Sequence, residues 1–270
     1  MTKPAVDSSF TTDVARFYES NLVPLIFRPY AKDLAARVRA VQPSHVLEIA
    51  CGTGVVTRAL SKALGENSSI IATDLNQAMV EHAKEISTTY PVEWRQADVM
   101  RLPFPDDSFD VVACQFSVMF FPDRIAAYKE IRRVLKPTGS FHFSVWNELD
   151  RNDFARAVTK ALELRYPENP PLFLDRTPHG HGNTREIEAD LNAAGFDVTS
   201  FTQLDEVSRA VSPEGPAIAY CQGTPLRNEI LDREPDGLLA ATQDAAKALE
   251  LEFGQGPIEG KISGVVVVAR

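Results

Sequence analysis

The sequence predicts an α/β fold built on a mainly parallel sheet. Apolar strand-like segments alternate with helix-forming segments from His45 to Val145, and this alternation is typical of parallel strands joined by helices. The clearest unit is residues 46–54, Val-Leu-Glu-Ile-Ala-Cys-Gly-Thr-Gly, where an apolar strand leads into a glycine turn and then into helix-forming residues 55–64. The chain has 270 residues, enough for one such domain with additions, so we expect a single domain over 1–270.

The composition restricts the class of partner. Acidic residues exceed basic residues by 37 to 28, which gives a formal net charge of −9 and a pI near 5.1. This average field repels polyanions, so we expect neither a nucleic-acid partner nor a membrane partner. The three cysteines form neither a metal-ligand spacing nor a disulfide framework. Because we also find no signal-peptide pattern and no apolar run long enough to span a membrane, we expect a cytoplasmic protein.

The expected elements follow from periodicity and turn residues. Residues 1–12 are expected to be frayed, and two helices should follow, Asp13–Ser20 and Pro24–Arg39, the second with a proline in its first turn. Strands are expected at 45–49, 69–74, 92–96, 108–115, 140–145, 197–203 and 261–269. Helices are expected at 123–136, 152–166, 183–195, 216–220, 225–232 and 235–253.

The turn after the first strand suits a polar ligand. Gly52 and Gly54 lack Cβ atoms, so the chain can turn sharply and a ligand can approach the backbone closely. The turn also presents backbone N–H groups and the positive end of the next helix. Asp74 closes the second strand, where an acid in doubly wound folds accepts the ribose hydroxyls of an adenosine. The alternative role of Asp74 is a helix N-cap, but Asn76 can provide that cap.

Further segments continue the series in order: Ala97-Asp98, residues 102–110 (Leu-Pro-Phe-Pro-Asp-Asp-Ser-Phe-Asp) and residues 134–139 (Val-Leu-Lys-Pro-Thr-Gly). Together with residues 46–54 and 72–74 they resemble the class I S-adenosylmethionine-dependent methyltransferases, in the subgroup sharing the ubiquinone/menaquinone-methyltransferase pattern. The resemblance covers residues 30–150. It implies a Rossmann-like fold whose seven-stranded sheet is mostly parallel with an antiparallel last strand, here with helical cap insertions.

By this resemblance the chain binds S-adenosylmethionine and releases S-adenosylhomocysteine. Gly52 and Gly54 would lie beside the methionine part of S-adenosylmethionine. Asp74 would bind the ribose hydroxyls, and Asp98 would bind the adenine amino group with Val99 beside it. The expected cofactor contacts are Tyr18, Glu48, Ala50, Cys51, Gly52, Gly54, Asp74, Leu75, Met79, Asp98, Val99, Gln115 and Phe116.

A nicotinamide-dependent dehydrogenase is the main rival for a glycine turn followed by an acid. The dinucleotide fingerprint needs a third glycine, so that helix and strand can pack closely around a pyrophosphate. Thr57 stands at that position, and S-adenosylmethionine has no pyrophosphate. Glu48 matches the acid before the glycines, which is usually an aspartate in the family, and Gln115 and Phe116 would line the reacting end.

The segments outside the core are expected to form a cap. We assign the core to 30–150, 184–206 and 258–270, and the cap to 1–29, 150–183 and 207–257, placed over the carboxyl ends of the fourth and fifth strands. Loops this long in a compact domain are usually functional. Trp146, Phe173 and Tyr220 are the expected acceptor-binding residues, although isolated aromatic residues also serve simple packing.

The sequence does not identify the acceptor or the catalytic residue. Candidates for a catalytic role are Tyr18, His142, His179 and His181; His142 also fits packing, since it alternates with two phenylalanines. No metal site is expected. The large cap favours a small-molecule acceptor, methylated on oxygen or carbon, with nitrogen also open. The alternatives are a non-catalytic cofactor-binding regulator and a protein or RNA methyltransferase. We expect a monomer or a homodimer.

Overall fold

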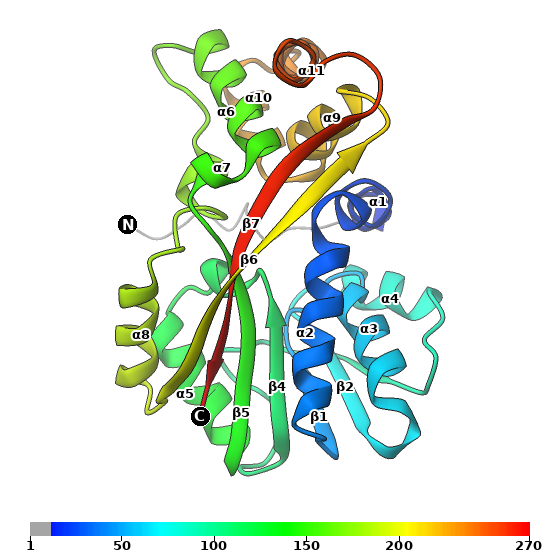
Figure 1. Ribbon diagram of the computed structural model, residues 1–270, viewed down its shortest axis with the longest axis vertical. Helices are drawn as coiled ribbons and strands as arrows, with labels where there is room; N and C mark the ends of the chain where they lie inside the picture. Colours follow the sequence, from blue (N-terminus) through cyan, green and yellow to red (C-terminus); the bar gives the residue numbers. More distant parts are fainter. Residues whose placement is uncertain (1–11) are drawn as a thin grey trace.

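The computed structural model describes residues 12–270 (Figure 1). Over these residues the sheet has seven strands in the order β3-β2-β1-β4-β5-β7-β6. Strands β1 to β5 are parallel, and β7 runs antiparallel to both β5 and β6. The expected Rossmann-like topology is therefore confirmed. The strands are β1 His45–Glu48, β2 Ser69–Asp74, β3 Glu93–Gln96, β4 Phe109–Gln115, β5 Leu135–Trp146, β6 Val198–Ala210 and β7 Ile258–Ala269.

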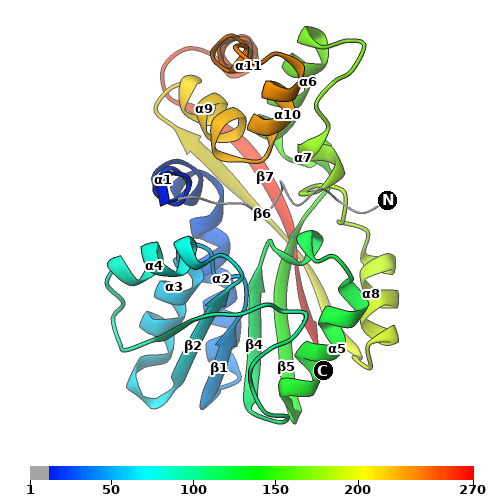
Figure 2. The same cartoon turned by 180° about the vertical axis from the view of Figure 1, so that it is seen from behind.

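Helices cover both faces of the sheet. On one face, α2 (Arg28–Ala40) and α3 (Val55–Leu64) pack over Val46, Val111 and Ala113. On the other face, α5 (Arg124–Val134) and α8 (Thr184–Ala193) lie over β5 and β6, as the reverse view shows (Figure 2). Successive residues of a strand point to opposite faces, so the apolar runs of β4 and β5 serve both layers. The remaining core helix, α4 (Gln77–Glu85), packs beside β2 and β3.

The N-terminal segment is one continuous helical run, which corrects the expectation of two helices. α1 (Thr12–Phe17) leads directly into a π-helical stretch, η2 (Tyr18–Phe27), and then into α2. Pro24 lies inside η2, whereas Pro29 occupies the first turn of α2. A proline cannot donate to the carbonyl four residues back and its ring crowds that carbonyl, so the helix widens at this point. We expected fraying over residues 1–12; Thr12 instead begins α1, and residues 1–11 lie outside the described residues.

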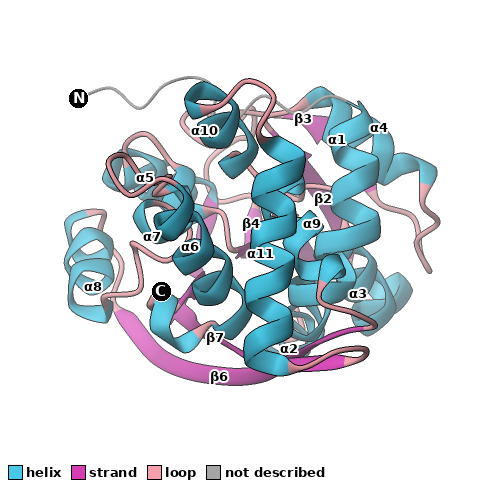
Figure 3. Ribbon diagram, turned by 90° about the horizontal axis from the view of Figure 1, so that it is seen from above, coloured by secondary structure: helices cyan, strands magenta, loops and turns pink. Residues whose placement is uncertain are grey.

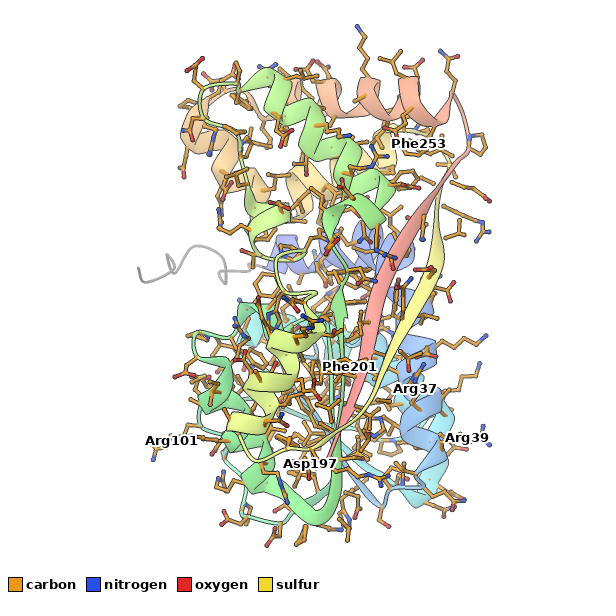
Figure 4. The ribbon with its side chains drawn as sticks, turned by 60° about the vertical axis from the view of Figure 1, so that its left-hand side comes forward. Arg37, Arg39, Arg101, Asp197, Phe201 and Phe253 are labelled. Atoms are coloured by element: carbon orange, nitrogen blue, oxygen red, sulfur yellow. The ribbon has the colours of Figure 1, made fainter. Side chains whose placement is uncertain are left out.

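The strands β6 and β7 extend well beyond their expected ends at 203 and 261. In the described structure β7 pairs with β5 from Gly264 to Ala269, whereas it pairs with β6 as far as Ile258 opposite Ala210. Residues 205–210 and 258–263 therefore leave the sheet as a two-stranded ribbon, which we call the arm. Figure 4 shows β6 rising from Asp197 past Phe201 and continuing into the arm, which reaches toward Phe253 at the end of α11. The sequence did not predict this extension of the two strands, because polar residues interrupt the apolar alternation there.

The strand β5 also begins earlier than expected, at Leu135 instead of Ser140. The residues between them, which we expected to end the preceding helix, pair irregularly with β4, and the register shifts between Phe109 and Val111. Asp123 begins α5 as expected, accepting a hydrogen bond from the N–H of Ala126 at 2.9 Å.

Five helices gather beyond the carboxyl ends of the parallel strands: α6 Asp153–Arg165, α7 Phe173–Arg176, α9 Glu214–Gly223, α10 Leu226–Arg233 and α11 Leu238–Phe253 (Figures 1 and 3). Arg165 of α6 forms ion pairs with Glu234 at 2.7 Å and Asp244 at 2.6 Å, which joins α6 to the segment of α10 and α11. Within residues 12–270 the helices are all too short or too polar to cross a membrane.

Candidate functional site

A cavity of about 850 Å³ lies between the carboxyl ends of β1, β2 and β4 and the cap helices. Every expected cofactor contact except Gly54 lines it, and so do the three expected acceptor contacts, Trp146, Phe173 and Tyr220. Its wall is largely apolar with a few polar groups, which is typical of small-molecule sites. A second hollow of about 570 Å³ opens to solvent beside α8, and it is lined by none of the expected site residues.

The glycine turn after β1 has a left-handed backbone at three positions, with φ of 51° at Ala50, 55° at Gly52 and 84° at Gly54. A Cβ atom built on Gly52 would meet no atom within 4 Å, so a side chain there would enter the cavity. Gly54 differs from the expectation, because it starts α3 and does not line the cavity. A Cβ atom on Gly54 would lie 2.9 Å from the ring of Trp94, so this glycine permits close packing.

Asp74 holds the glycine turn as well as facing the cavity. Its carboxylate accepts hydrogen bonds from the N–H groups of Gly52 and Asn76, both at 2.8 Å. Asn76 caps α4, with its side chain accepting from the N–H of Ala78 at 2.9 Å. Burial raises the pKa of Asp74, and the two N–H groups oppose that rise. Each carboxylate oxygen keeps a lone pair for a ligand hydroxyl.

Two buried acceptor atoms in the cavity wall lack a hydrogen-bond partner among the described residues. They are Oε2 of Glu48 and Oε1 of Gln115, whose Nε2 donates to the carbonyl of Phe27 at 3.2 Å. Burial raises the pKa of Glu48 to about 8, while the Thr57 hydroxyl and the charge of Arg58 lower it. Unpartnered buried acceptors are costly, so these atoms fit a ligand that brings donors. The ammonium group of S-adenosylmethionine is such a donor.

The far end of the cavity combines apolar walls with a second acid. Leu75, Met79 and Val99 line it, and Leu75 lies at the rim with 54% of its surface exposed. One oxygen of Asp98 accepts a hydrogen bond from the N–H of Met100 at 2.9 Å. An apolar slot beside a carboxylate can accommodate a flat base that carries an amino group, so these residues fit the adenine end of the cofactor.

Stacked aromatic rings form the wall at the opposite end. The rings of Phe116 and Trp146 are parallel within 1° at a centroid distance of 3.6 Å. Phe27 packs at 6.0 Å from each of them, and Tyr18 stacks on Phe27 at 5.2 Å. Phe116 has a φ of 51°, a conformation that is strained for a bulky residue and that persists where packing enforces it. This strain lies directly at the carboxyl end of β4.

The N-terminal helical run closes one side of the cavity through a contact that no sequence pattern indicates. The carboxylate of Glu19 accepts a hydrogen bond from the Thr53 hydroxyl at 2.5 Å and pairs with Arg58 at 2.6 Å. Arg58 also donates to the carbonyl of Thr53 at 2.7 Å. Glu19 resembles any helix-surface acid in the sequence, yet here it joins η2 to the glycine turn.

The four candidate catalytic residues separate into two groups. Tyr18 and His179 line the cavity, whereas His142 and His181 do not. His142 is buried in β5, and its Nε2 lies 2.8 Å from the Ser140 hydroxyl oxygen. Its position is that of a side chain packed in the core. Burial, together with the charges of Asp74 and Glu19, raises the pKa of Tyr18, which therefore stays a hydroxyl at neutral pH.

Some cavity residues were missed from the sequence. Phe27, Phe120, Phe121 and Asn152 line the cavity, although none was expected to do so. Asn152 directly precedes α6 and has the sequence signature of an N-cap, but its side chain does not cap that helix. Within residues 12–270 there is no cluster of three or more His, Cys, Asp or Glu side chains suited to a metal ion.

The sheet order, the glycine turn and the two strand-end acids together define the class I methyltransferase fold. Residues 47–143 match the family described as a methyltransferase domain, so the resemblance inferred from the sequence is confirmed for this part of the chain.

Relatives of known name support the same class. The chain is 36% identical over 135 residues to the demethylmenaquinone methyltransferase of Lactobacillus johnsonii, which covers 47% of this chain and 55% of that protein. It is 39% identical over 109 residues to the demethylmenaquinone methyltransferase of Staphylococcus aureus strain JH9, covering 40% of this chain and 44% of that protein. The chain thus spans about half the length of the curated relatives that it matches.

Solved structures show the same fold at low sequence identity. A Bacillus halodurans protein whose methyltransferase activity is inferred has a TM-score of 0.56 at 17% identity, covering 87% of this chain and 97% of that one. The [4+2]-cyclase SpnF has a TM-score of 0.53 at 19% identity, covering 88% and 79%. The second example shows that this fold also supports other chemistry, so activity must be argued from the site.

Proposed function

We propose that this protein transfers a methyl group from S-adenosylmethionine to a small, apolar, ring-bearing acceptor. The observation that carries the proposal is one continuous cavity, which joins the glycine turn, Asp74 and Asp98 to an aromatic wall under the cap. A volume of about 850 Å³ lies in the upper part of the range for small-molecule sites. Two bound reactants could therefore meet there in an enclosed space.

The donor end supports a cationic ligand. Glu48, Asp74 and Asp98 place three acidic side chains in the wall, and the unpartnered Oε2 of Glu48 would accept from the donor's ammonium group. When bound, S-adenosylmethionine supplies a methyl group that its sulfonium already activates. The task left to the chain is mainly alignment, which can supply roughly 7 to 11 kcal/mol of the barrier.

The acceptor end supports a flat, uncharged ring. Its wall includes Phe27, Phe116, Trp146 and Phe173, while His179 and Asn152 are polar groups there. Aromatic walls favour aromatic ligands through stacked and edge-to-face contacts. The relatives named demethylmenaquinone methyltransferases support a quinone-type ring, methylated on carbon or oxygen. The enclosing cap favours such a molecule over a protein or RNA substrate.

Calorimetry followed by turnover tests the proposal. We expect binding of S-adenosylmethionine and S-adenosylhomocysteine, weak or no binding of NAD(H), and formation of S-adenosylhomocysteine with reduced quinones and phenols. Amines, a protein mixture and RNA serve as the comparison acceptors. Tight binding of NAD(H) without either sulfur cofactor would overturn the whole proposal. Turnover restricted to amines, protein or RNA would overturn the acceptor class, and cofactor binding without turnover of any acceptor would favour a regulatory protein.

A further inference from the structure

A buried polar cluster lies between the acceptor end of the cavity and the arm. It consists of Asn147, Asn152, His179 and Ser263, with exposed fractions of 9%, 1%, 7% and 0%. Asn152 and His179 also line the cavity. The four residues come from the end of β5, the start of α6, the loop after α7 and the strand β7. Buried polar groups are expensive unless they are satisfied, so a cluster assembled from four segments calls for an explanation.

The two asparagines fix one carbonyl group. The amide nitrogen of Asn152 lies within hydrogen-bond distance of the carbonyl oxygens of Glu148 at 3.1 Å, Asn147 at 3.3 Å and Ser263 at 3.3 Å, which share its two N–H groups. Its amide oxygen accepts from the N–H of Ser263 at 3.0 Å. The side chain of Asn147 donates to the Ser263 hydroxyl at 2.8 Å, which in turn donates to Asp205 at 2.5 Å. The Asn147 carbonyl is thereby held by Asn152 at the start of α6, and the Asn147 side chain ties the same residue to Ser263 of β7.

That carbonyl determines the tautomer of His179. Nδ1 of His179 lies 2.8 Å from the Asn147 carbonyl oxygen, which can only accept, so Nδ1 carries the ring proton. The amide nitrogen of Asn152 is farther from Nδ1, at 3.4 Å. In a neutral imidazole the other nitrogen then has a free lone pair. Both side-chain hydrogen-bond contacts of His179 within the described residues involve Nδ1, which leaves Nε2 for a ligand.

The charge state also suits a proton acceptor. Burial lowers the pKa of His179 to about 4, with the Asn147 carbonyl opposing the shift, so the ring is neutral at physiological pH. A group with this pKa is a weak base. The hydroxyl proton of a phenol or hydroquinone becomes strongly acidic, however, as the bond to the methyl carbon withdraws electrons from the ring or the oxygen. A weak base that is always unprotonated can therefore take the proton late in the reaction.

We propose that Nε2 of His179 accepts the hydroxyl proton of the methyl acceptor, and that Asn152, acting through the Asn147 carbonyl, is the positioning residue. This inference rests on the proposed methyl transfer. The acceptor's oxygen, or its adjoining ring carbon, forms the bond to the methyl carbon. The bond from that carbon to sulfur breaks, and its electron pair stays on sulfur. The proton moves to Nε2, so one positive charge passes from sulfur to the imidazole and then to solvent. For attack by carbon, the first product is a cyclohexadienone; its ring C–H proton then leaves while the oxygen regains a proton from solvent, which restores the aromatic ring and the hydroxyl group.

The first test needs neither donor nor acceptor. Long-range ¹H–¹⁵N NMR of the imidazole should show His179 protonated at Nδ1 and unprotonated at Nε2 at neutral pH. Asn152→Ala, or the milder Ser263→Ala if the first variant does not fold, should shift His179 toward a mixture of tautomers. A wild-type ring protonated at Nε2 would overturn the assignment even if methyl transfer is established, and unchanged tautomers in both variants would overturn the positioning role.

The second test uses turnover on phenols of graded acidity. His179→Gln should lower kcat by about 10² to 10⁴-fold, the usual range for a general base, and leave donor affinity unchanged. The loss should shrink for phenols that are already ionised, which a purely structural effect would not produce. Asn152→Ala should lower kcat by up to about a hundredfold, as for a misplaced reacting group. His45→Gln, which alters an exposed histidine at the start of β1 and outside the cavity wall, is the control with the same substitution and should turn over normally.

A double variant separates the two roles. If Asn152 acts through His179, then Asn152→Ala combined with His179→Gln should be no slower than His179→Gln alone. Additive losses, or a loss in His179→Gln that is equal for all phenols, would overturn the inference. If no phenol or hydroquinone is methylated by the wild type while its His179 tautomer is as stated, the proposed acceptor class fails and the geometry of the cluster stands.

Discussion

The two ends of the cavity are built in different ways. At the donor end, the side chains come from the segments that follow three successive strands, β1, β2 and β3, and backbone groups of these segments hold them in place, as Gly52 and Asn76 do for Asp74. At the acceptor end, the wall comes from η2, the ends of β4 and β5, α7 with the loop after it, and α9 with the segment after it. The donor end therefore depends on local chain geometry, whereas the acceptor end depends on tertiary packing.

This difference shows where substitutions should act. A change at the donor end should weaken cofactor binding and spare the cap, and a change at the acceptor end should do the reverse. The aromatic wall links the ends, because Phe116 at the end of β4 stacks on Trp146 at the end of β5. Substitution of either ring could affect both ends of the cavity at once. Residues farther from that pair therefore give clearer tests of the difference between the two ends.

The largest expected effect is on the cap. Phe173→Ala and Phe154→Ala each remove a buried phenyl ring, with exposed fractions of 1% and 0%, but only Phe173 lines the cavity. Both should lower the free energy of unfolding by about 3 to 5 kcal/mol. Only Phe173→Ala should also lower kcat/KM for the acceptor, by roughly tenfold to a hundredfold, as expected from losing about 1.5 to 3 kcal/mol of apolar contact.

Urea unfolding, donor calorimetry and acceptor kinetics on both variants provide the measurement. Phe154 packs edge-on against Phe253 at a centroid distance of 5.2 Å, so its loss is a matched structural perturbation of the same helical cap. Equal losses of acceptor turnover in the two variants would mean that general cap stability, and not the wall at Phe173, controls the acceptor.

A smaller effect is expected at Asp74. Asp74→Ala should weaken S-adenosylmethionine binding by about tenfold to a hundredfold, since a hydrogen bond to a charged group contributes roughly 1.5 to 3 kcal/mol. It should also reduce stability, by about 1 to 3 kcal/mol, because the N–H groups of Gly52 and Asn76 lose their acceptor. The acceptor KM at saturating donor should not change.

The matched control is Asn183→Ala, which removes the N-cap of α8 and should lower stability by about 0.5 to 2 kcal/mol; neither Asn183 nor its chain neighbours line the cavity. Calorimetry and urea unfolding compare the two. If Asp74→Ala loses stability and keeps full donor affinity, Asp74 is a structural residue of the glycine turn and the donor end is assigned wrongly.

A third expected effect, similar in size to the loss of stability at Asp74, depends on pH. The pKa of Glu48 is raised from 4.5 to about 8, so between these values the folded state holds a proton that the unfolded state has lost. The contribution of Glu48 to stability is therefore fully present below pH 4.5 and is lost as the pH rises through 8, at up to about 1.4 kcal/mol per pH unit. Glu48→Gln should remove this loss. The free energy of unfolding of the variant, relative to that of the wild type, should therefore rise from pH 6 to pH 8.

Urea unfolding at the two pH values measures the effect. Donor binding at pH 7 should also release a proton from the wild type and not from Glu48→Gln, which calorimetry in two buffers of different ionisation enthalpy detects. An equal pH dependence in both proteins would mean that Glu48 is ionised in the free protein and does not respond to the donor.

The contrast between the ends also explains what the sequence could predict. Residues 46–54, Asp74 and Asp98 were identifiable because each lies at or just after the end of a strand, and parallel strands bring their carboxyl ends to one edge of the sheet. The placement of Glu19 could not be predicted from the sequence, because its partners Thr53 and Arg58 lie 34 and 39 residues away along the chain. The left-handed φ of Phe116 was also hidden, since nothing in a phenylalanine marks a strained turn.

Two predictions failed for physical reasons that apply elsewhere. Pro24 suggested a helix start, but a helix can pass a proline by widening into π geometry when its neighbours hold it. The β6 half of the arm was missed because polar residues lie on both of its faces, Glu206 and Ser208 on one and Asp205 on the other, so the apolar alternation disappears there. Among the histidines, only packing could distinguish His179 from His142 and His181.

The arm has a consequence for how this enzyme class could acquire new acceptors. Ala210 and Ile258 face each other at its tip, so the 47 residues between them leave and re-enter the fold at one point. The free energy of closing such a loop rises only slowly with its length. The inserted helices can therefore change in length without changing the strand register, as long as the new helices keep the packing on α6 that the ion pairs of Arg165 provide here.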